Sequence, residues 1–352
     1  MFKSAIVGCG VIGKEHAKAY RECKEIRLEA VIDIKDEHAI DLHQMYDVPF
    51  YTTLEDVLAR PDINFIDVCV PSGLHGDIAI AAAKAGKHCI CEKPLDVTPQ
   101  RCDEIVAAFE KSGTVLGGIY QHRFHDDVRK TKAALDAGRL GRLALATCST
   151  PWWRTQEYYD SGDWRGTWKL DGGGALMNQS IHAIDLLLWF AGPIRTVFAY
   201  TALLAHQRIE VEDVAVAVCR FESGALGVIE GTTAAFSGTS VLHRVMGNNG
   251  TIHLSDDRIM HWKIRDEAGK EEPKAEPKPE KKAGSSAASD PTVLSHSLFS
   301  RNLDDIARAA RTGGRPVVTG REARKAVEVI CAIYKSARTG KEVTLPLKEF
   351  HA

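Results

Sequence analysis

The chain has 352 residues, 44% of them hydrophobic, which is long enough for two domains with a core each. Its 45 Lys and Arg balance 47 Asp and Glu, which excludes the basic surface of a protein that binds nucleic acid or lies on a membrane, and its apolar runs are too short to span a bilayer. Nine cysteines without framework or metal-ligand spacing, and a start without a secretory signal, predict reduced thiols, no metal and a cytoplasmic protein.

The first elements predict a dinucleotide-binding domain. Residues 2–7 are typical of a buried strand, a glycine-rich turn follows, and a helix is expected over 14–23. The second strand, 28–32, ends on Asp33, at the distance expected for an acid that accepts hydrogen bonds from the adenosine ribose. Its carboxylate favours NAD over NADP, although Lys35 nearby weakens this discrimination. The turn is expected to approach the pyrophosphate with Gly8, Gly10, Val11, Ile12 and Gly13.

Strands and helices alternate as far as residue 122, which predicts a doubly wound parallel sheet. The carboxyl ends of parallel strands share one rim, where such sheets bind their ligands. Strand 65–70 ends at that rim, and strand 88–91 leads directly into Glu92-Lys93-Pro94. Further cofactor contacts are therefore expected from Pro71, Ser72, His75, Glu92 and Lys93.

The pattern changes after residue 122. Strand-like segments from 196 to 233, and a hairpin signal at Gly247-Asn248-Asn249-Gly250, predict an α+β domain over 123–352 with a large, mostly antiparallel open sheet. Residues 265–291 are charged and of low complexity, so we expect an exposed insertion there.

Two stretches of this second domain carry candidate site residues. The first, 152–168, is rich in Trp, Tyr and Arg, and it can either cap a core or stack on a sugar ring or a nicotinamide. In the second, a helix expected over 175–190 follows three glycines and places Asn178 and His182 on one face. Asp185 can orient His182 or bond elsewhere.

The chain resembles the glucose–fructose oxidoreductase / inositol dehydrogenase / MocA (Gfo/Idh/MocA) family. Three motifs carry this resemblance: the glycine fingerprint, Glu92-Lys93-Pro94, and Gly172-Gly173-Gly174 followed by Asn178 and His182. The resemblance covers nearly the whole chain except 265–291. It implies a Rossmann domain followed by an α+β domain whose open sheet forms a homodimer or homotetramer contact. It also implies that Lys93 and His182 are catalytic.

Within the family, two segments resemble those of UDP-N-acetylglucosaminuronate 3-dehydrogenase-like sugar dehydrogenases. They are Arg154-Thr155-Gln156-Glu157-Tyr158-Tyr159 and Trp164-Arg165-Gly166. One departure is Asn178, where several polyol-oxidising members have an aspartate. Because an amide cannot share proton transfer, the role of base is expected to rest on His182.

The hypothesis is an NAD-dependent sugar dehydrogenase that takes a hydride from a secondary hydroxyl, at C3 of a sugar, uronate or glycoside. His182 would act as base and Lys93 would stabilise the oxygen. Two alternatives are a redox-neutral glycosidase or lyase acting through a 3-keto sugar, and a non-catalytic NAD-binding regulator. Substrate contacts are expected from Gln121, Arg123, Arg154, Tyr159 and Asn178, and further cofactor contacts from Trp164 and Arg165.

Overall fold

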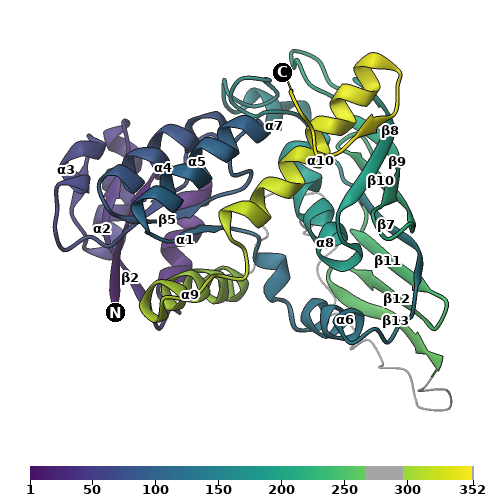
Figure 1. Cartoon of the computed structure of the whole chain (residues 1–352). Coiled ribbons are helices and arrows are strands. Elements are labelled where there is room, and N and C mark those ends of the chain that lie inside the picture. The colour runs from purple at the N-terminus through teal and green to yellow at the C-terminus, as the bar shows by residue number, and fades with distance from the viewer. Residues whose placement is uncertain (266–295, 351–352) are drawn as a thin grey trace. The chain divides into compact units, whose positions relative to one another are not determined.

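The computed structural model describes residues 1–265 and 296–350. The chain folds as two compact units, one of residues 1–121 with 294–324 and the other of 122–293 with 325–352. Figure 1 names their elements. Among the described residues, no helix has the length and apolar character needed to cross a membrane. The charged insertion expected over 265–291 lies, apart from Arg265, outside the described residues.

The first unit contains a six-stranded parallel sheet in the order β3-β2-β1-β4-β5-β6, which confirms the predicted doubly wound fold. Helices cover both faces, with α1 and α9 on one and α4 and α5 on the other (Figure 1). The strands are β1 Phe2–Val7, β2 Ile26–Ile32, β3 Phe50–Tyr51, β4 Phe65–Val68, β5 His88–Cys91 and β6 Leu116–Gly118. The helices from the N-terminal stretch are α1 Val11–Tyr20, α2 Asp36–Tyr46, α3 Leu54–Leu58, α4 His75–Lys84 and α5 Pro99–Ser112.

Helix α9, His296–Thr312, belongs to this first unit although it lies far along the chain. The expected boundary at residue 122 assigned 294–324 to the second domain, and the structure corrects that assignment. The reason is apolar packing: Phe299, Leu303 and Ile306 of α9 are buried in the same core as residues of α1 and β1. An amphipathic pattern indicates a helix with one buried face, but it does not indicate which core that face of α9 covers.

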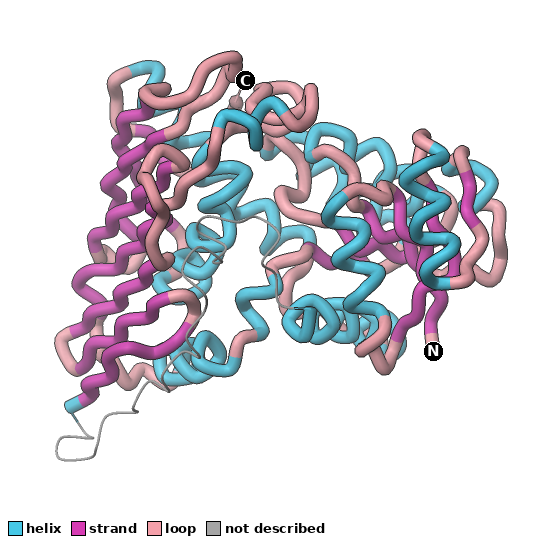
Figure 2. Tube along the Cα trace, turned by 180° about the vertical axis from the view of Figure 1, so that it is seen from behind, coloured by secondary structure: helices cyan, strands magenta, loops and turns pink. Residues whose placement is uncertain are grey.

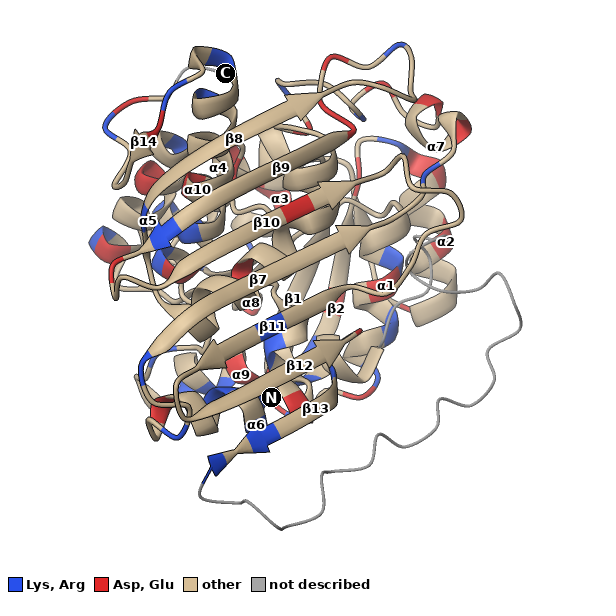
Figure 3. Ribbon diagram, turned by 90° about the vertical axis from the view of Figure 1, so that its right-hand side faces the viewer, with Lys and Arg blue, Asp and Glu red and all other residues tan. Residues whose placement is uncertain are grey.

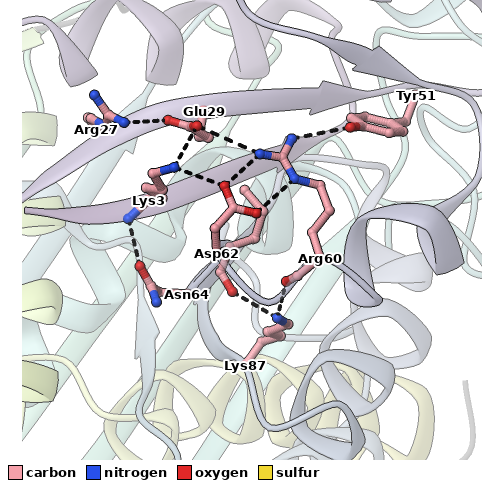
Figure 4. Close-up of polar contacts among 9 residues, drawn as sticks. Lys3, Arg27, Glu29, Tyr51, Arg60, Asp62, Asn64 and Lys87 are labelled. Atoms are coloured by element: carbon pink, nitrogen blue, oxygen red, sulfur yellow. Dashed lines mark hydrogen bonds and ion pairs between the residues drawn. The ribbon is translucent and has the colours of Figure 1, made fainter.

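The amino ends of the parallel strands are joined by a polar network (Figure 4). Lys3 contacts Glu29 at 2.8 Å and Asp62 at 2.9 Å, and Arg60 contacts Asp62 at 2.7 Å. Lys87 donates to the carbonyls of Arg60 and Ile63. Open parallel sheets bind their ligands at the opposite edge, where the glycine-rich turn lies, and this network connects neighbouring segments of the fold.

The second unit contains an eight-stranded sheet in the order β13-β12-β11-β7-β10-β9-β8-β14. All the pairings are antiparallel except β10 with β7, which confirms the predicted mostly antiparallel sheet. Its helices lie on one side of the sheet (Figure 2). The strands are β7 Leu143–Pro151, β8 Ile194–Ala202, β9 Val214–Phe221, β10 Leu226–Thr232, β11 Leu242–Gly247, β12 Gly250–Ser255, β13 Arg258–Ile264 and β14 Val343–Thr344.

The helices of this unit include α6 Asp126–Asp136, α7 Gln156–Asp160 and α8 Ile181–Ala191, while α10, Gly320–Thr339, starts in the first unit and ends in the second. Helix α8 packs on β7 and β11. The helix expected over 175–190 is not uniform, because Ala175–Ser180 forms a π-helix and only then does α8 begin. Insertions of π-helix are frequent at functional sites.

Candidate active site

The glycine-rich turn has the geometry that its motif predicts. Gly8 has a φ of 98°, and a Cβ on it would lie 2.6 Å from the carbonyl oxygen of Cys69. A Cβ on Gly13 would lie 2.0 Å from the carbonyl oxygen of Gly8, so a larger residue would push α1 away from the turn. Gly10, the residue before α1, has open space around its Cβ position. The turn therefore leaves room for a pyrophosphate at the amino end of α1, beside Val11 and Ile12.

Asp33 lies at the carboxyl end of β2 and is bonded to the same turn. Its Oδ2 accepts a hydrogen bond of 2.7 Å from the backbone N–H of Cys9, and its Oδ1 accepts one of 2.9 Å from the backbone N–H of Lys35. His38 Nδ1 lies 3.7 Å from Oδ2. Each carboxylate oxygen keeps acceptor capacity beyond these bonds, as a ribose hydroxyl requires.

The turn that carries Lys93 is fixed on both sides of that residue. Buried Glu92 accepts a 2.9 Å bond from the backbone N–H of Lys93, and its other oxygen lies 3.0 Å from His16 Nε2. The carbonyl of Pro94 lies 2.7 Å from His75 Nδ1. Lys93 itself is half-buried and lies two residues after the end of β5. The peptide bond between Lys93 and Pro94 is cis.

The remaining residues predicted for this rim lie in the loop after β4. Pro71 precedes a short 3-10 turn over Ser72–Leu74, and Ser72 is buried. His75, at the start of α4, is 1% exposed, and its Nε2 lies 2.9 Å from the Val70 carbonyl. Both ring nitrogens of His75 thus face backbone carbonyls, which makes this side chain a link between two rim segments.

In the second unit, Glu212 fixes the start of the segment that carries Asn178 and His182. Its carboxylate accepts hydrogen bonds from the backbone N–H groups of Gly174 at 3.0 Å and Leu176 at 2.8 Å, and from Tyr334 Oη at 2.9 Å. Burial raises the pKa of Glu212 to about 7. The carboxylate thus holds the amino end of the π-helix, whose first N–H groups have no partner within the helix.

Asn178 lies in a polar cluster with the aromatic segment. Asn178 donates to Asp171, and Gln179 donates to Asn178 Oδ1 at 3.0 Å and to Tyr158 Oη at 2.8 Å. Arg154 Nη2 donates to Gln179 Oε1 at 2.9 Å. The cluster continues to Arg165, which donates to Tyr158 Oη at 2.6 Å.

One aromatic residue of this segment caps a core, which is one of the two roles that the sequence left open. Tyr159 is 5% exposed, bonds Thr233 Oγ1 at 2.8 Å and packs on the ring of His206, so it caps a core. Trp164 is only half-buried, and the guanidinium of Arg165 lies over its ring at 4.5 Å. A planar cation on an aromatic surface suits stacking on a ligand ring.

Arg123 and Gln121 lie in a short 3-10 turn, Gln121–Phe124. Arg123 is 2% exposed and donates twice to Asp185 of α8, at 2.8 and 2.6 Å. Asp185, whose partner the sequence left open, therefore bonds Arg123. Gln121 is buried, and its Oε1 accepts no hydrogen bond from the described residues.

Comparison with known proteins shows to which family the chain belongs. Residues 2–120 match the family described as "Oxidoreductase family, NAD-binding Rossmann fold", and residues 128–253 match the "GFO/IDH/MocA C-terminal domain". The solved WlbA dehydrogenase of Bordetella pertussis, in complex with NADH and UDP-GlcNAcA, is 33% identical over 99% of both chains with a TM-score of 0.84. The chain belongs to the Gfo/Idh/MocA family.

Two more relatives support this assignment. The WlbA dehydrogenase of Chromobacterium violaceum, also solved with NADH and UDP-GlcNAcA, is 32% identical over 99% of this chain and 97% of the other, with a TM-score of 0.85. Myo-inositol 2-dehydrogenase of Thermotoga maritima is 25% identical over 97% of both chains. This Gfo/Idh/MocA protein is accordingly an NAD-dependent oxidoreductase of the sugar and polyol dehydrogenase family.

The structure of this Gfo/Idh/MocA protein also contains polar residues that the sequence did not single out. His16 lies between Asp67 and Glu92, Glu212 holds the π-helix, and His122 contacts both Asp257 and His182. His16 could have been found from its place three residues after Gly13 on α1. Glu212 and Asp257 come from loops far along the chain, and nothing in their local sequence signals the contact.

Proposed function

We propose that the protein oxidises a secondary hydroxyl at C3 of a pyranose that carries a uronate or glycosidic substituent. The observation that carries this proposal is the match, over 99% of both chains, to a dehydrogenase solved with NADH and UDP-GlcNAcA. NAD, when bound, accepts the hydride at its nicotinamide ring. The protein supplies position and proton handling.

His182 is proposed as the base that takes the hydroxyl proton, and the Lys93 ammonium as the donor to the same oxygen as negative charge develops on it. A free imidazole has a pKa of about 6.5, so this side chain type can accept a proton near neutral pH. A positioned general base is typically worth about 10²–10⁴ in rate. Asn178, whose amide cannot take the proton, is proposed to orient a second hydroxyl of the ring.

Both catalytic side chains extend from backbone that is fixed by buried groups, which supports their proposed roles. The backbone N–H of Lys93 donates to the Glu92 carboxylate, and the carbonyl of Pro94 lies within hydrogen-bond distance of His75 Nδ1. The helix of His182 starts at a π-helix held by the Glu212 carboxylate. Such support is expected where reacting groups must hold one geometry.

In the first unit, cofactor contacts are proposed for the glycine-rich turn, Asp33 and the residues that follow β4 and β5. In the second unit, they are proposed for Trp164 and Arg165. The open Gly10, the acceptor oxygens of Asp33 and the stacked pair of Trp164 and Arg165 support this assignment. Substrate contacts are proposed for Gln121, Arg154 and Asn178. Gln121 and Arg154 are buried polar residues, and Arg154 is linked to Asn178 through hydrogen bonds to Gln179.

The test is a substrate panel with purified protein and NAD⁺, containing UDP-GlcNAcA, UDP-glucuronate, free uronates, alkyl glucosides and myo-inositol. We expect NADH absorbance with a uronate or glycoside and a product lighter by two hydrogen atoms. Regiochemistry follows from borodeuteride reduction of the product, which should place deuterium at C3. Release of the aglycone without net NADH would instead identify the redox-neutral reaction, and deuterium at another carbon would overturn the C3 assignment.

Two variants test the roles. Lys93→Ala and His182→Ala should each lower kcat by about 10²–10⁴ while NADH still binds, as followed by its fluorescence. Lys84→Ala, an exposed lysine on α4, and His253→Asn on β12 are matched controls that should keep turnover. Near-normal turnover in either test variant would show that its role is wrongly assigned.

We also propose that two copies associate through the open face of the eight-stranded sheet. Figure 3 shows that face with few charged residues along the strands. Tyr200 of β8 pairs in register with Val216 of β9, and Phe198 with Val218. Tyr200 is 72% exposed and Val218 is 53% exposed, which is unusual for adjacent apolar residues unless a partner covers them.

A further inference from the structure

His122 joins three elements of the second unit at the proposed base. It lies in the turn Gln121–Phe124, and its Nδ1 is hydrogen-bonded to Oδ2 of Asp257, which sits between β12 and β13. Its ring lies against the ring of His182 of α8, with centroids 4.8 Å apart and planes at 44°. None of these contacts is explained by the proton transfer assigned to His182.

The contact between His122 and Asp257 favours an ion pair, with a positive charge on the imidazole and a negative charge on the carboxylate. Burial opposes a charge on His122, but the Asp257 carboxylate outweighs it and raises the pKa of the imidazole. Burial likewise works against the Asp257 anion, and the His122 charge lowers the pKa of that carboxyl. Asp257 is 7% exposed, and its carboxylate is held by the hydrogen bond to His122 Nδ1.

The other charged groups near His122 do not replace this arrangement. Asp185 of α8 adds to the negative potential, but its two oxygens accept from Arg123. Asp256 belongs to the same turn as Asp257 and accepts from the backbone N–H of Val241. His243 of β11 faces the Ala183 carbonyl through Nε2, and burial lowers its pKa, so its charged form is less favoured than that of an exposed histidine. The remaining groups around Asp257 are His125, at the start of α6, and Asp127, which accepts from the N–H of Ile259.

We propose that His122, held as an imidazolium by Asp257, is a positioning residue that keeps His182 in its neutral, proton-accepting form. Two rings in contact cannot both carry a positive charge without repulsion, so a fixed charge on one favours the neutral state of the other. The Asp257 carboxylate is essential in this arrangement, because it is the anion hydrogen-bonded to the half-buried His122 ring and so favours the charged form of that ring. This inference rests on the proposed role of His182 as base.

The direct test does not require turnover. In protein labelled with ¹³C at histidine Cε1, the resonances of His182 and His122 are assigned by their loss in His182→Ala and His122→Asn, and their titrations are followed by NMR. In the unsubstituted protein, His122 should titrate at a higher pH than His182. In His122→Asn, the pKa of His182 should rise by about one pH unit, since the neighbouring charge is gone and Asp257 remains.

Asp257→Asn tests the other half of the proposal and serves where His122→Asn does not fold. Its expected effect is a fall in the pKa of His122. His253→Asn is the matched control, because His253 forms a similar ring pair with His261 at 5.0 Å and 41° on the same sheet. That variant should leave both titrations unchanged. A neutral His122 at pH 7 in the unsubstituted protein, or an unmoved His182 in His122→Asn, would overturn the inference.

A kinetic measurement separates this inference from the proposed function. With an active substrate, the acidic limb of kcat/KM should move to higher pH in His122→Asn, so that the ratio of rates at pH 6 and pH 8 falls by up to about tenfold. If His182→Ala keeps its activity, the assigned base is wrong, whereas the NMR titrations still decide whether His122 sets the charge of its neighbour. An unshifted limb in an active His122→Asn variant would contradict the inference alone.

Discussion

His16 of α1 and Glu92 of the Lys93 turn are joined by a contact of 3.0 Å between Nε2 and Oε1, and the other ring nitrogen of His16 lies 2.9 Å from Asp67. All three side chains are buried. The helix that follows the glycine-rich turn is thereby connected to the backbone of the proposed catalytic lysine through a single imidazole. Burial opposes a charge on that ring, but Asp67 outweighs it and raises the pKa of His16 well above its usual range.

Replacing His16 should therefore be costly. His16→Leu leaves two carboxylates buried without a cation, and the loss of a partner from a buried ion pair typically costs about 3–5 kcal/mol. Urea unfolding measures the loss. His43→Leu, which removes a single contact to the Val48 carbonyl, is the matched control and should cost about 1 kcal/mol. Equal losses in the two variants would show that the bridging position of His16 has no special weight.

The same imidazole gives a pH dependence with a definite sign. Because the folded-state pKa is raised, the stabilisation is fully present below about pH 6.5 and is lost as the pH rises through the raised value. The free energy of unfolding of the unsubstituted protein should thus fall on the alkaline side relative to a His16→Gln variant. A constant difference between the two proteins from pH 6 to pH 10 would contradict a charged His16.

Asp33→Ala should weaken NAD binding and relax the discrimination against NADP. The substitution removes the acceptor proposed for the ribose hydroxyls and the negative charge that repels a 2′-phosphate. Calorimetric titration with both nucleotides gives the ratio of affinities. Asp36→Ala, in the exposed first turn of α2, controls for the general loss of a nearby charge. An unchanged ratio would show that Asp33 serves only to hold the Cys9 N–H.

Glu212 should make stability depend on pH near neutrality. Since burial raises its pKa to about 7, the protonated form favours folding, and this contribution is present below about pH 4.5 and lost as the pH rises through about 7. The pKa of about 7 already includes the opposing effect of the three donors around the carboxylate, so the change in unfolding free energy between pH 5 and pH 8 should be about 3 kcal/mol or less. Glu212→Gln should flatten the profile, and Glu210→Gln, an exposed neighbour, should not. A Glu212→Gln profile as steep as that of the unsubstituted protein would assign the slope to another group.

The Arg123–Asp185 pair should be strongly coupled. Asp185→Asn leaves a buried guanidinium without its charge partner and should cost about 3–5 kcal/mol in urea unfolding. Replacing both residues, as Arg123→Met with Asp185→Leu, should recover much of that loss, because a well-packed apolar pair needs no compensation. Additive losses in the double variant would mean that the two side chains do not act as a pair.

Association through the open sheet should be sensitive to one charge. Val218→Glu places a carboxylate among the apolar side chains of β8 and β9 and should shift the molar mass measured by light scattering toward the monomer. Met45→Glu, an exposed apolar residue of α2, is the control and should leave the mass unchanged. A Val218→Glu protein with unaltered mass, or a monomeric unsubstituted protein, would refute this interface.

The parts that were predictable from the sequence are those whose signal is local. The turn from Gly8 to Gly13, Asp33 at the end of its strand and the hairpin between Gly247 and Gly250 each depend on neighbouring residues. The partners of buried charges could not be predicted in this way. Asp185 bonds Arg123, 62 residues earlier, and Glu212 holds a helix start 36 residues before it, because packing rather than chain neighbourhood decides which donors a buried carboxylate meets. The π-helix before His182 could not be predicted either, because its hydrophobic spacing matches that of an ordinary α-helix.

The place of α9 in the core of the first unit has a consequence for biosynthesis. A ribosome completes the strands of the nucleotide sheet long before it produces Phe299, Leu303 and Ile306. Until then the part of α1 that packs against α9 is not covered, so a nascent chain holds an unfinished domain while most of the second unit is being made. Excision of residues 1–122 as a separate fragment should accordingly yield an aggregation-prone product, whereas fusing 296–324 to its end through a short linker should restore a soluble one.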